Sequence, residues 1–155
     1  MDKHIQTFDE LTQIERFGNY VLTQDIDCGG ASIPNLLGDF SGVLDGNGHT
    51  VYNLVLTDRI WGDEQSLALF CSTSKATIKN ISFENLTLSY DAGCYSPRVA
   101  ALVVNCYKTT ITGVKVIASN KSAKETPLVY DCNNCNLVNN TMMCNGKPDT
   151  IAKYE

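Results

Sequence analysis

The feature that most constrains this chain is a short block of alternating apolar residues that recurs along it. Residues 50–56 (TVYNLVL) match 77–83 (TIKNISF) and 110–116 (TITGVKV), and a degenerate copy follows at 136–142 (NLVNNTM). In the first three copies the second, fifth and seventh positions are apolar, and the copies begin 27, 33 and 26 residues apart. Self-similarity at such spacings is typical of repeat proteins in which successive copies stack on one another.

A second block precedes the first at a constant offset. Residues 68–70 (ALF), 101–103 (ALV) and 127–129 (PLV) each begin ten residues before the second residue of the matching first block. Both blocks are rich in β-branched and apolar residues in alternation, which indicates strands. We therefore expect an all-β solenoid whose rungs, spread over residues 20–143, add strands to parallel sheets about 4.8 Å apart.

The stretch 40–56 predicts a strand, a tight turn and a second strand. Its turn, residues 45–48 (DGNG), combines two glycines with an asparagine, the residue types that accept a positive φ. The same letters resemble the start of a calcium-binding loop, but Leu56 stands where that loop needs an acidic residue, so the turn is the favoured interpretation. Residues 20–28 read as one further strand.

Stacking would also bring equivalent polar residues into line. Asn53, Asn80 and Asn139 share the fourth position of the first block, so we expect an inward ladder of side-chain amides that Gly113 interrupts. Cys106 and Cys132 hold equivalent positions in the repeats. We expect both to stack as small core residues, with a disulfide as the alternative.

The two ends of the chain differ from the repeats. Thr7 and Glu10 form a capping box, and an apolar stripe at spacings of three follows it, so residues 8–17 predict a short amphipathic helix that covers an apolar surface. Residues 144–155 break the repeat pattern and form a C-terminal tail. Either this tail covers the last strand edges or a second chain does, which would produce self-association. We expect one domain over residues 1–155.

Several of these segments together resemble a known class of repeat. Residues 19–27 (NYVLTQDID), 40–51 (FSGVLDGNGHTV), 69–70 and 77–81 (TIKNI) are similar to the right-handed parallel β-helix modules of bacterial surface proteins, the adhesin-like and GLUG-type repeats. The resemblance covers about residues 5 to 117. It implies a short right-handed β-helix of about four to five rungs with an N-terminal capping helix. It implies no activity, because such repeats are mostly scaffolds.

Composition limits the kinds of partner that the protein can bind and the cellular compartment in which it is expected. The net charge of −5 disfavours direct nucleic-acid binding, which needs a basic surface. No apolar run is long enough for a membrane span, and the first residues lack a secretory pattern, so a cytoplasmic protein is expected, or an extracellular one if a signal has been removed.

Seven cysteines favour reduced, buried thiols over a disulfide framework. The single CxxC, Cys132 and Cys135, is a weak zinc signal that core packing explains better, and no cofactor or metal is predicted.

The best candidate binding surface lies in the insertions of the repeats. Residues 57–66, 89–98 and 117–126 interrupt successive repeats at the same place, so they should emerge on one side of the stack. Trp61, the one tryptophan of the chain, is either a binding residue or folds back over the flank. The predicted partner-binding residues are Arg59, Trp61, Asp63, Glu64, Tyr90, Asp91, Tyr95 and Arg98, with Lys121 and Lys124 on the third insertion.

Three functions remain open at this stage. The first is a non-enzymatic protein-interaction module, for instance an intracellular acidic inhibitor that a phage or mobile element directs against a host defence protein or a nucleic-acid-handling complex. The second is a carbohydrate- or surface-binding fragment of an adhesin. The third is a reduced polysaccharide lyase or hydrolase using Asp25, Asp27 and Asp45, although the basic residues such enzymes need are few here.

Overall fold

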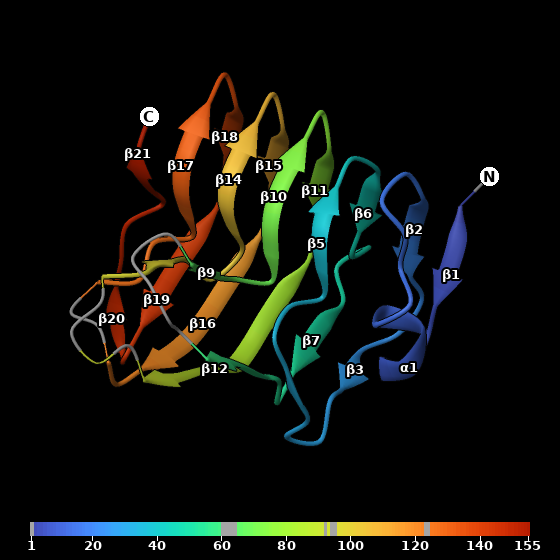
Figure 1. The fold of residues 1–155 in the computed structure, drawn as a ribbon. Helices are drawn as coiled ribbons and strands as arrows, with labels where there is room; N and C mark the ends of the chain where they lie inside the picture. The colour runs from blue at the N-terminus through green and yellow to red at the C-terminus, as the bar shows by residue number, and fades with distance from the viewer. Residues whose placement is uncertain (1, 60–64, 92, 94–95, 123–124) are drawn as a thin grey trace.

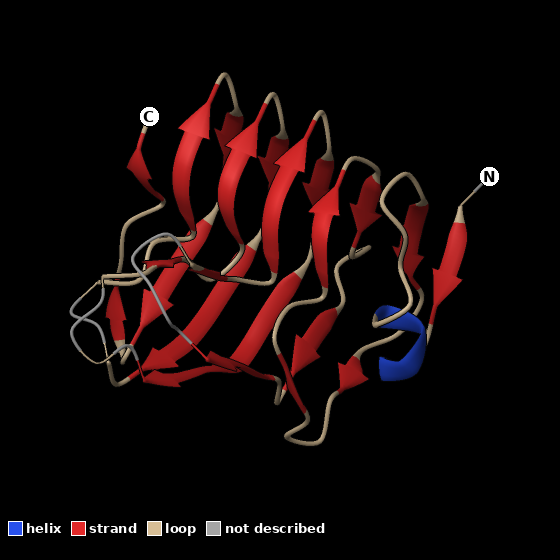
Figure 2. Ribbon diagram, in the orientation of Figure 1, coloured by secondary structure: helices blue, strands red, loops and turns tan. Residues whose placement is uncertain are grey.

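The computed structural model describes residues 2–59, 65–91, 93, 96–122 and 125–155, and the side chain of Arg59 is not described. This part of the chain is mostly β-structure with one short helix (Figures 1 and 2). Most strands belong to three sheets, called A, B and C here, whose strands pair in parallel apart from one antiparallel pair at the C-terminal end. The two termini lie at opposite ends of the stack of strands (Figure 1).

The three sheets have regular strand orders. Sheet A contains, in spatial order, β1 (Lys3–Ile5), β2 (Asn19–Leu22), β6 (Val43–Asp45), β11 (Thr77–Lys79), β15 (Thr110–Thr112) and β18 (Asn136–Val138). Sheet B contains β3 (Ile26–Asp27), β7 (Thr50–Tyr52), β12 (Ser82–Asp91), β16 (Lys115–Asn120), β19 (Thr141–Cys144) and β20 (Lys147–Pro148). Sheet C contains β5 (Leu37–Phe40), β10 (Phe70–Ser74), β14 (Val103–Tyr107), β17 (Val129–Asn133) and β21 (Ala152–Tyr154).

Further strands lie outside these three strand orders. In sheet B, β8 (Val55–Arg59) pairs with β12 and with β4 (Ser32–Ile33), and a separate pair joins β9 (Ser66–Leu67) to β13 (Arg98–Val99). The chain passes through sheets C, A and B in that order four times, as β5–β6–β7, β10–β11–β12, β14–β15–β16 and β17–β18–β19. We call these passages the second, third, fourth and fifth coils, and β2–β3 the first.

The repeat alignment is confirmed from the third coil onward. Ile78 lies opposite Ile111, and Ile111 lies opposite Leu137, as the first block predicts. Phe70 and Val129 both lie opposite Val103, as the second block predicts. Equivalent residues of these coils are therefore neighbours across adjoining backbones.

The alignment of the earliest copy is wrong. Ile78 lies opposite Leu44 on its other side, whereas Val51 lies opposite Phe83 and Ile26 in sheet B. The cause is a longer corner: four residues, 46–49, separate β6 from β7, whereas two residues separate β11 from β12. Neighbouring strands of one coil share a similar apolar pattern. Residues 50–56 therefore resemble residues 77–83 in sequence, although β7 pairs with β12 and β11 pairs with β6.

The asparagine ladder is also corrected. Asn80, Gly113 and Asn139 do occupy one corner, but their shared property is a left-handed backbone, with φ of 53°, 65° and 58°. Asparagine and glycine adopt this conformation at the smallest cost, so they turn the chain from sheet A into sheet B. Asn53 belongs to a different corner, with φ of 63°, where Asn85 is its counterpart at 51°.

A row of polar side chains does connect the coils at that second corner. The Asn85 amide donates to Asn53 Oδ1 at 2.7 Å, and the Asn53 amide donates to Asp27 Oδ1 at 3.0 Å. The Gly29 N–H also donates to Asp27 Oδ1, at 2.8 Å. These residues lie on the surface, so the ladder points outward and links the first three coils.

The core consists of apolar rows that run along the stack. Ile26, Val51, Phe83, Val116 and Met142 form the row from sheet B, and all five are buried. In sheet C the Phe40 and Phe70 rings stack with centroids 5.2 Å apart. Cys106 lies opposite Cys132, which confirms their predicted stacking, and both thiols are free.

The N-terminal helix is much shorter than the predicted 8–17. Helix α1 spans Phe8–Leu11, with Thr7 accepting the Glu10 N–H as its N-cap and Thr12 as its C-cap. Leu11 and Ile14 are buried, but Phe17 is 74% exposed and so lies off the expected apolar stripe. The Thr12 hydroxyl donates to the Asp9 carbonyl, which helps to end the helix after one turn. The predicted strand 20–28 is likewise divided into β2 and β3, which lie in different sheets.

The C-terminal tail folds across two of the three sheets. Strand β21 extends sheet C by pairing with β17, and β20 pairs antiparallel with β19 in sheet B. Strand β18 is the last strand of sheet A among the described residues, and Val138 on it is 43% exposed. One edge of the final coil therefore stays uncovered by the described chain.

The corner at Gly46 provides a test of the corrected stacking. A Cβ at Gly46 would overlap the Asn80 carbonyl oxygen and Ile81 of the next coil, whereas a Cβ at Gly38 meets nothing within 4 Å. We expect Gly46→Ala to lower the free energy of unfolding by about 2 kcal/mol or more, and Gly38→Ala to change it by about 0.5 kcal/mol or less. Urea unfolding measures both, and equal midpoints for the two variants would contradict this packing.

The outward ladder predicts a pH dependence. Its hydrogen bonds, chiefly from the Asn53 amide and then from the Gly29 N–H, lower the pKa of Asp27. A lowered folded-state pKa adds stability that is complete above the ordinary carboxyl pKa of about 4 and is lost as the pH falls through the folded-state value. The stability difference between the wild type and Asp27→Asn should therefore shrink below about pH 4. Urea midpoints from pH 7 to pH 3 measure it, and a difference that stays constant with pH would count against the ladder.

Candidate binding surface

The described ends of the first two repeat insertions lie side by side. Their leading arms pair in parallel as β8 and β12, with Thr57 opposite Ser89 and Arg59 opposite Asp91. Their returning arms pair as β9 and β13, where Ser66 lies opposite Arg98. Backbone pairing therefore places the described ends of the two insertions next to each other.

The third insertion is attached to the second by hydrogen bonds. The Asn120 amide donates to the Tyr90 hydroxyl at 3.3 Å, and the Ser122 hydroxyl donates to the Tyr90 carbonyl at 3.0 Å. Tyr90 is half-buried and packs against the core cluster. It therefore joins two insertions as well as offering part of its ring to the surface.

The remaining predicted residues have mixed positions. The Asp91 carboxylate accepts the Gly93 N–H at 3.0 Å and so holds a turn, and Arg98 is half-buried at the start of β13. Lys121 is exposed. Trp61, Asp63, Glu64, Tyr95 and Lys124 lie outside the described residues, and Arg59 is described by its backbone alone.

Asn120 is a central residue of this surface that the sequence patterns did not single out. It is 1% exposed, and its amide also donates to Thr126 Oγ1 at 3.0 Å. Its side-chain oxygen accepts the Ser122 N–H at 3.0 Å, and its backbone exchanges two hydrogen bonds with the Asn145 side chain. Asn120 therefore fixes the third insertion to both the second insertion and the C-terminal tail. Its place inside the third insertion, 117–126, was the available signal.

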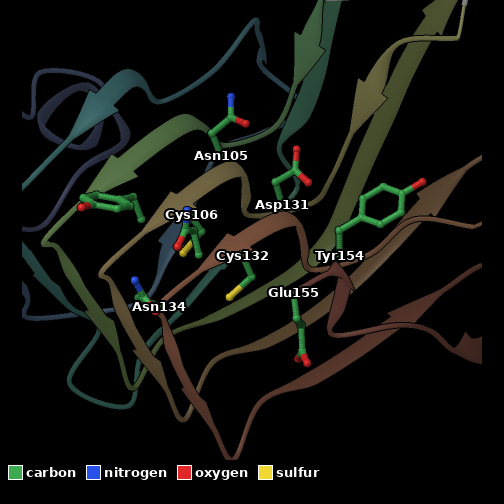
Figure 3. A pocket seen from close by; sticks show the side chains of 9 residues that line it. Asn105, Cys106, Asp131, Cys132, Asn134, Tyr154 and Glu155 are labelled. Carbon is green, nitrogen blue, oxygen red and sulfur yellow. The ribbon is translucent and has the colours of Figure 1, made fainter.

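A hollow on sheet C is a second candidate site that sequence reasoning missed. It has a volume of about 570 Å³ and opens beside β14, β17 and β21 (Figure 3). Asn105 and Asp131 are register partners, and Tyr154 lies opposite Asp131 on β21. The lining residues are Asn105, Cys106, Tyr107, Asp131, Cys132, Asn133, Asn134, Tyr154 and Glu155. The available signal lay in the residues that follow two copies of the second repeat block, 105–107 and 131–134.

This hollow is lined by exposed tyrosine rings together with amide and carboxylate side chains. Tyr107 is 40% exposed and Tyr154 is 52% exposed. The Tyr130 and Tyr154 rings meet edge to face at 5.5 Å, and the Lys153 ammonium lies 5.1 Å from the Tyr130 ring centroid. Amide and carboxylate groups beside exposed tyrosine rings can hydrogen-bond a polyol while a ring contacts its apolar face.

The carboxylates considered for catalysis each have a local hydrogen-bonding role. Asp25 accepts the Thr50 N–H at 2.9 Å and lies 3.1 Å from His49 Nδ1, and these contacts lower its pKa. Asp27 belongs to the outward ladder. Asp45 accepts the Asn47 N–H at 2.8 Å and so closes its own turn, as the turn interpretation of residues 45–48 predicts. These contacts explain the three carboxylates as parts of the coil corners.

Three cysteines gather where the fourth and fifth coils meet. Cys135 Sγ lies 3.1 Å from Cys106 Sγ, and Cys132 is the register partner of Cys106. Burial raises the pKa of the Cys106 thiol and raises the pKa of Cys132 to about 11. Among the described residues, no group of three or more His, Cys, Asp or Glu side chains is arranged to hold a metal ion.

Comparisons with known proteins found no match. No protein-family model, no curated protein and no solved structure matches the chain. In the described residues no helix is both long and apolar enough to cross a bilayer.

The role of Asn120 is tested by its removal. Asn120→Ala would leave the Ser122 N–H and Thr126 hydroxyl without this partner, so we expect a loss of about 2 kcal/mol in the free energy of unfolding. Lys121→Ala, an exposed neighbour, should change it by about 0.5 kcal/mol or less. Urea denaturation of both variants measures the difference. Equal stability of the two would show that Asn120 does not hold the insertions together.

Proposed function

We propose that this chain is a non-enzymatic protein-interaction module whose three insertions, 57–66, 89–98 and 117–126, form one contact face. The observation that carries the proposal is the strand pairing of the first two insertions, joined by the bonds that the third makes to Tyr90. Loops held by a rigid sheet make suitable binding surfaces because little order is lost when a partner binds. Tyrosine, tryptophan and arginine on these insertions are types enriched where binding energy concentrates.

We further propose that the scaffold is a right-handed parallel β-helix, as in the adhesin-like repeats that the sequence resembles. Repeated passage of the chain through sheets C, A and B, with equivalent residues in register, supports this architecture. In this proposal α1 covers the N-terminal end of the stack, since Leu11 of α1 and Ile14, which follows it, join the core cluster. The uncovered β18 edge is then a candidate for self-association.

The proposed role is that of an acidic inhibitor in the cytoplasm, made by a phage or mobile element against a host protein. A net charge of −5 favours a partner with a basic surface, and long-range attraction would speed the encounter. A host complex that handles nucleic acid presents such a surface. Binding of this kind should weaken as salt screens the charges.

Capture from host lysate tests the contact face. We expect the wild type to retain a partner that Trp61→Ala loses by about tenfold or more in affinity, because truncating a central aromatic anchor typically costs about 2 kcal/mol or more. Phe17→Ala is the matched control, since Phe17 is an aromatic residue, 74% exposed, outside the insertions. Hydrogen exchange of the complex should show protection in the three insertions. Equal capture by all three proteins, or protection confined to sheet C, would contradict the proposal.

The sheet C hollow favours a second function, carbohydrate binding, as in an adhesin fragment. Exposed Tyr107 and Tyr154 beside Asn105 and Asp131 offer ring faces and hydrogen-bonding groups to a sugar. A glycan array separates the two functions: a signal that Tyr154→Ala abolishes and Trp61→Ala leaves intact supports the hollow. A protein partner lost with Trp61→Ala and no glycan signal supports the insertions.

A further inference from the structure

The sulfur atoms of Cys106 and Cys135 lie closer together than two sulfur atoms in ordinary van der Waals contact. Their sulfur atoms are 3.1 Å apart, and the Cys135 thiol also lies 3.1 Å from the Cys106 carbonyl oxygen. Cys106 belongs to β14 in the fourth coil, whereas Cys135 follows β17 at the corner of the fifth. A disulfide has an S–S length of about 2.0 Å, so a sulfur shift of about 1 Å would join the two coils.

The repeat explains why the two thiols meet. One coil earlier, the Thr109 hydroxyl donates to Thr73 Oγ1 at 3.0 Å. Thr73 is the register partner of Cys106, and Thr109 and Cys135 both directly precede the register partners Thr110 and Asn136. The junction of the fourth and fifth coils therefore holds two thiols where the junction of the third and fourth coils holds two hydroxyls. A hydroxyl pair can only hydrogen-bond, whereas a thiol pair can also be oxidised.

A small-molecule oxidant can reach this pair from one side. A hollow of about 350 Å³ is lined by Cys132, Asn134, Cys135, Asn136, Leu137 and Glu155. Cys135 is half-buried, whereas Cys106 is 2% exposed. An oxidant in this hollow would therefore react with the Cys135 thiol first. The buried Cys106 thiol would react in the second step.

We propose that Cys135 and Cys106 form a reversible disulfide that joins the fourth and fifth coils, with a low-molecular-weight disulfide such as oxidised glutathione as the oxidant. The Cys135 thiolate attacks one sulfur of the oxidant, forms a mixed disulfide and releases one thiolate. The Cys106 thiol then loses its proton to water and attacks the Cys135 sulfur, which releases the second thiolate. Two protein thiols are oxidised and one small disulfide is reduced to two thiols, so the electrons balance.

This bond would close the segment that carries the third insertion. Residues 117–126 lie between the two cysteines, and so do β15 and β16. Cross-linking a segment of this length restricts the unfolded chain. The oxidised protein should thus hold its last two coils, and the insertion between them, more firmly than the reduced protein does.

The test compares the full chain after treatment with oxidised glutathione or with a phosphine reductant. Non-reducing tryptic mapping detects the bond, because cleavage after Arg98, Lys108 and Lys124 separates the peptide with Cys106 from the one that holds Cys132, Cys135 and Cys144. Fragmentation of the cross-linked pair then shows which of these three cysteines is bonded. We expect a cross-link between these peptides and a melting temperature higher by about 5 to 10 °C in the oxidised form.

Three variants make the test decisive. Cys135→Thr and Cys106→Thr each introduce one threonine of the pair found one coil earlier, so each variant should fold, form no cross-link and melt alike under the two treatments. Cys132→Ser, the matched control, should keep the cross-link and the thermal shift. A bond between Cys132 and Cys135, a cross-link that persists in Cys135→Thr, or thiols that all stay available to a maleimide after oxidation would each overturn the proposal.

Discussion

The structure depends on backbone hydrogen bonds between equivalent strands of successive coils. Each strand of sheets A, B and C inside the stack pairs in parallel with the coil before it and the coil after it. This pairing aligns like side chains, so apolar residues form continuous buried rows and polar residues form rows of their own. The register therefore determines both what the core contains and which insertions become neighbours.

The corners determine where that register can be kept. Left-handed asparagine or glycine backbones recur at the turns, among them Asn80, Gly113 and Asn139 at one corner and Asn53 with Asn85 at another. These residues turn the chain sharply with few residues, which keeps the distance between strands constant from coil to coil. A longer corner is accepted at residues 46–49, where Gly46 allows close contact with the next coil.

Much of the fold could be predicted from the sequence, because periodic apolar residues identify strands that stack. The pairing of Ile78 with Ile111 and of Cys106 with Cys132 followed from spacing alone. The partner of Val51 did not, because two strands of one coil share a pattern and spacing cannot tell which one an extended corner has displaced. The helix 8–17 was overestimated because its apolar spacing continues past the point where Thr12 ends it. Asn120 and the sheet C hollow were missed, since their roles arise from contacts between segments far apart in the chain.

The register can be measured directly by nuclear Overhauser effects between backbone protons of neighbouring coils. We expect cross-strand contacts from Ile78 to Leu44 on one side and to Ile111 on the other, with Val51 in contact with Ile26 and Phe83. Cross-strand contacts between Ile78 and Val51 would contradict the stacking, and with it the proposal that the three insertions form a common face.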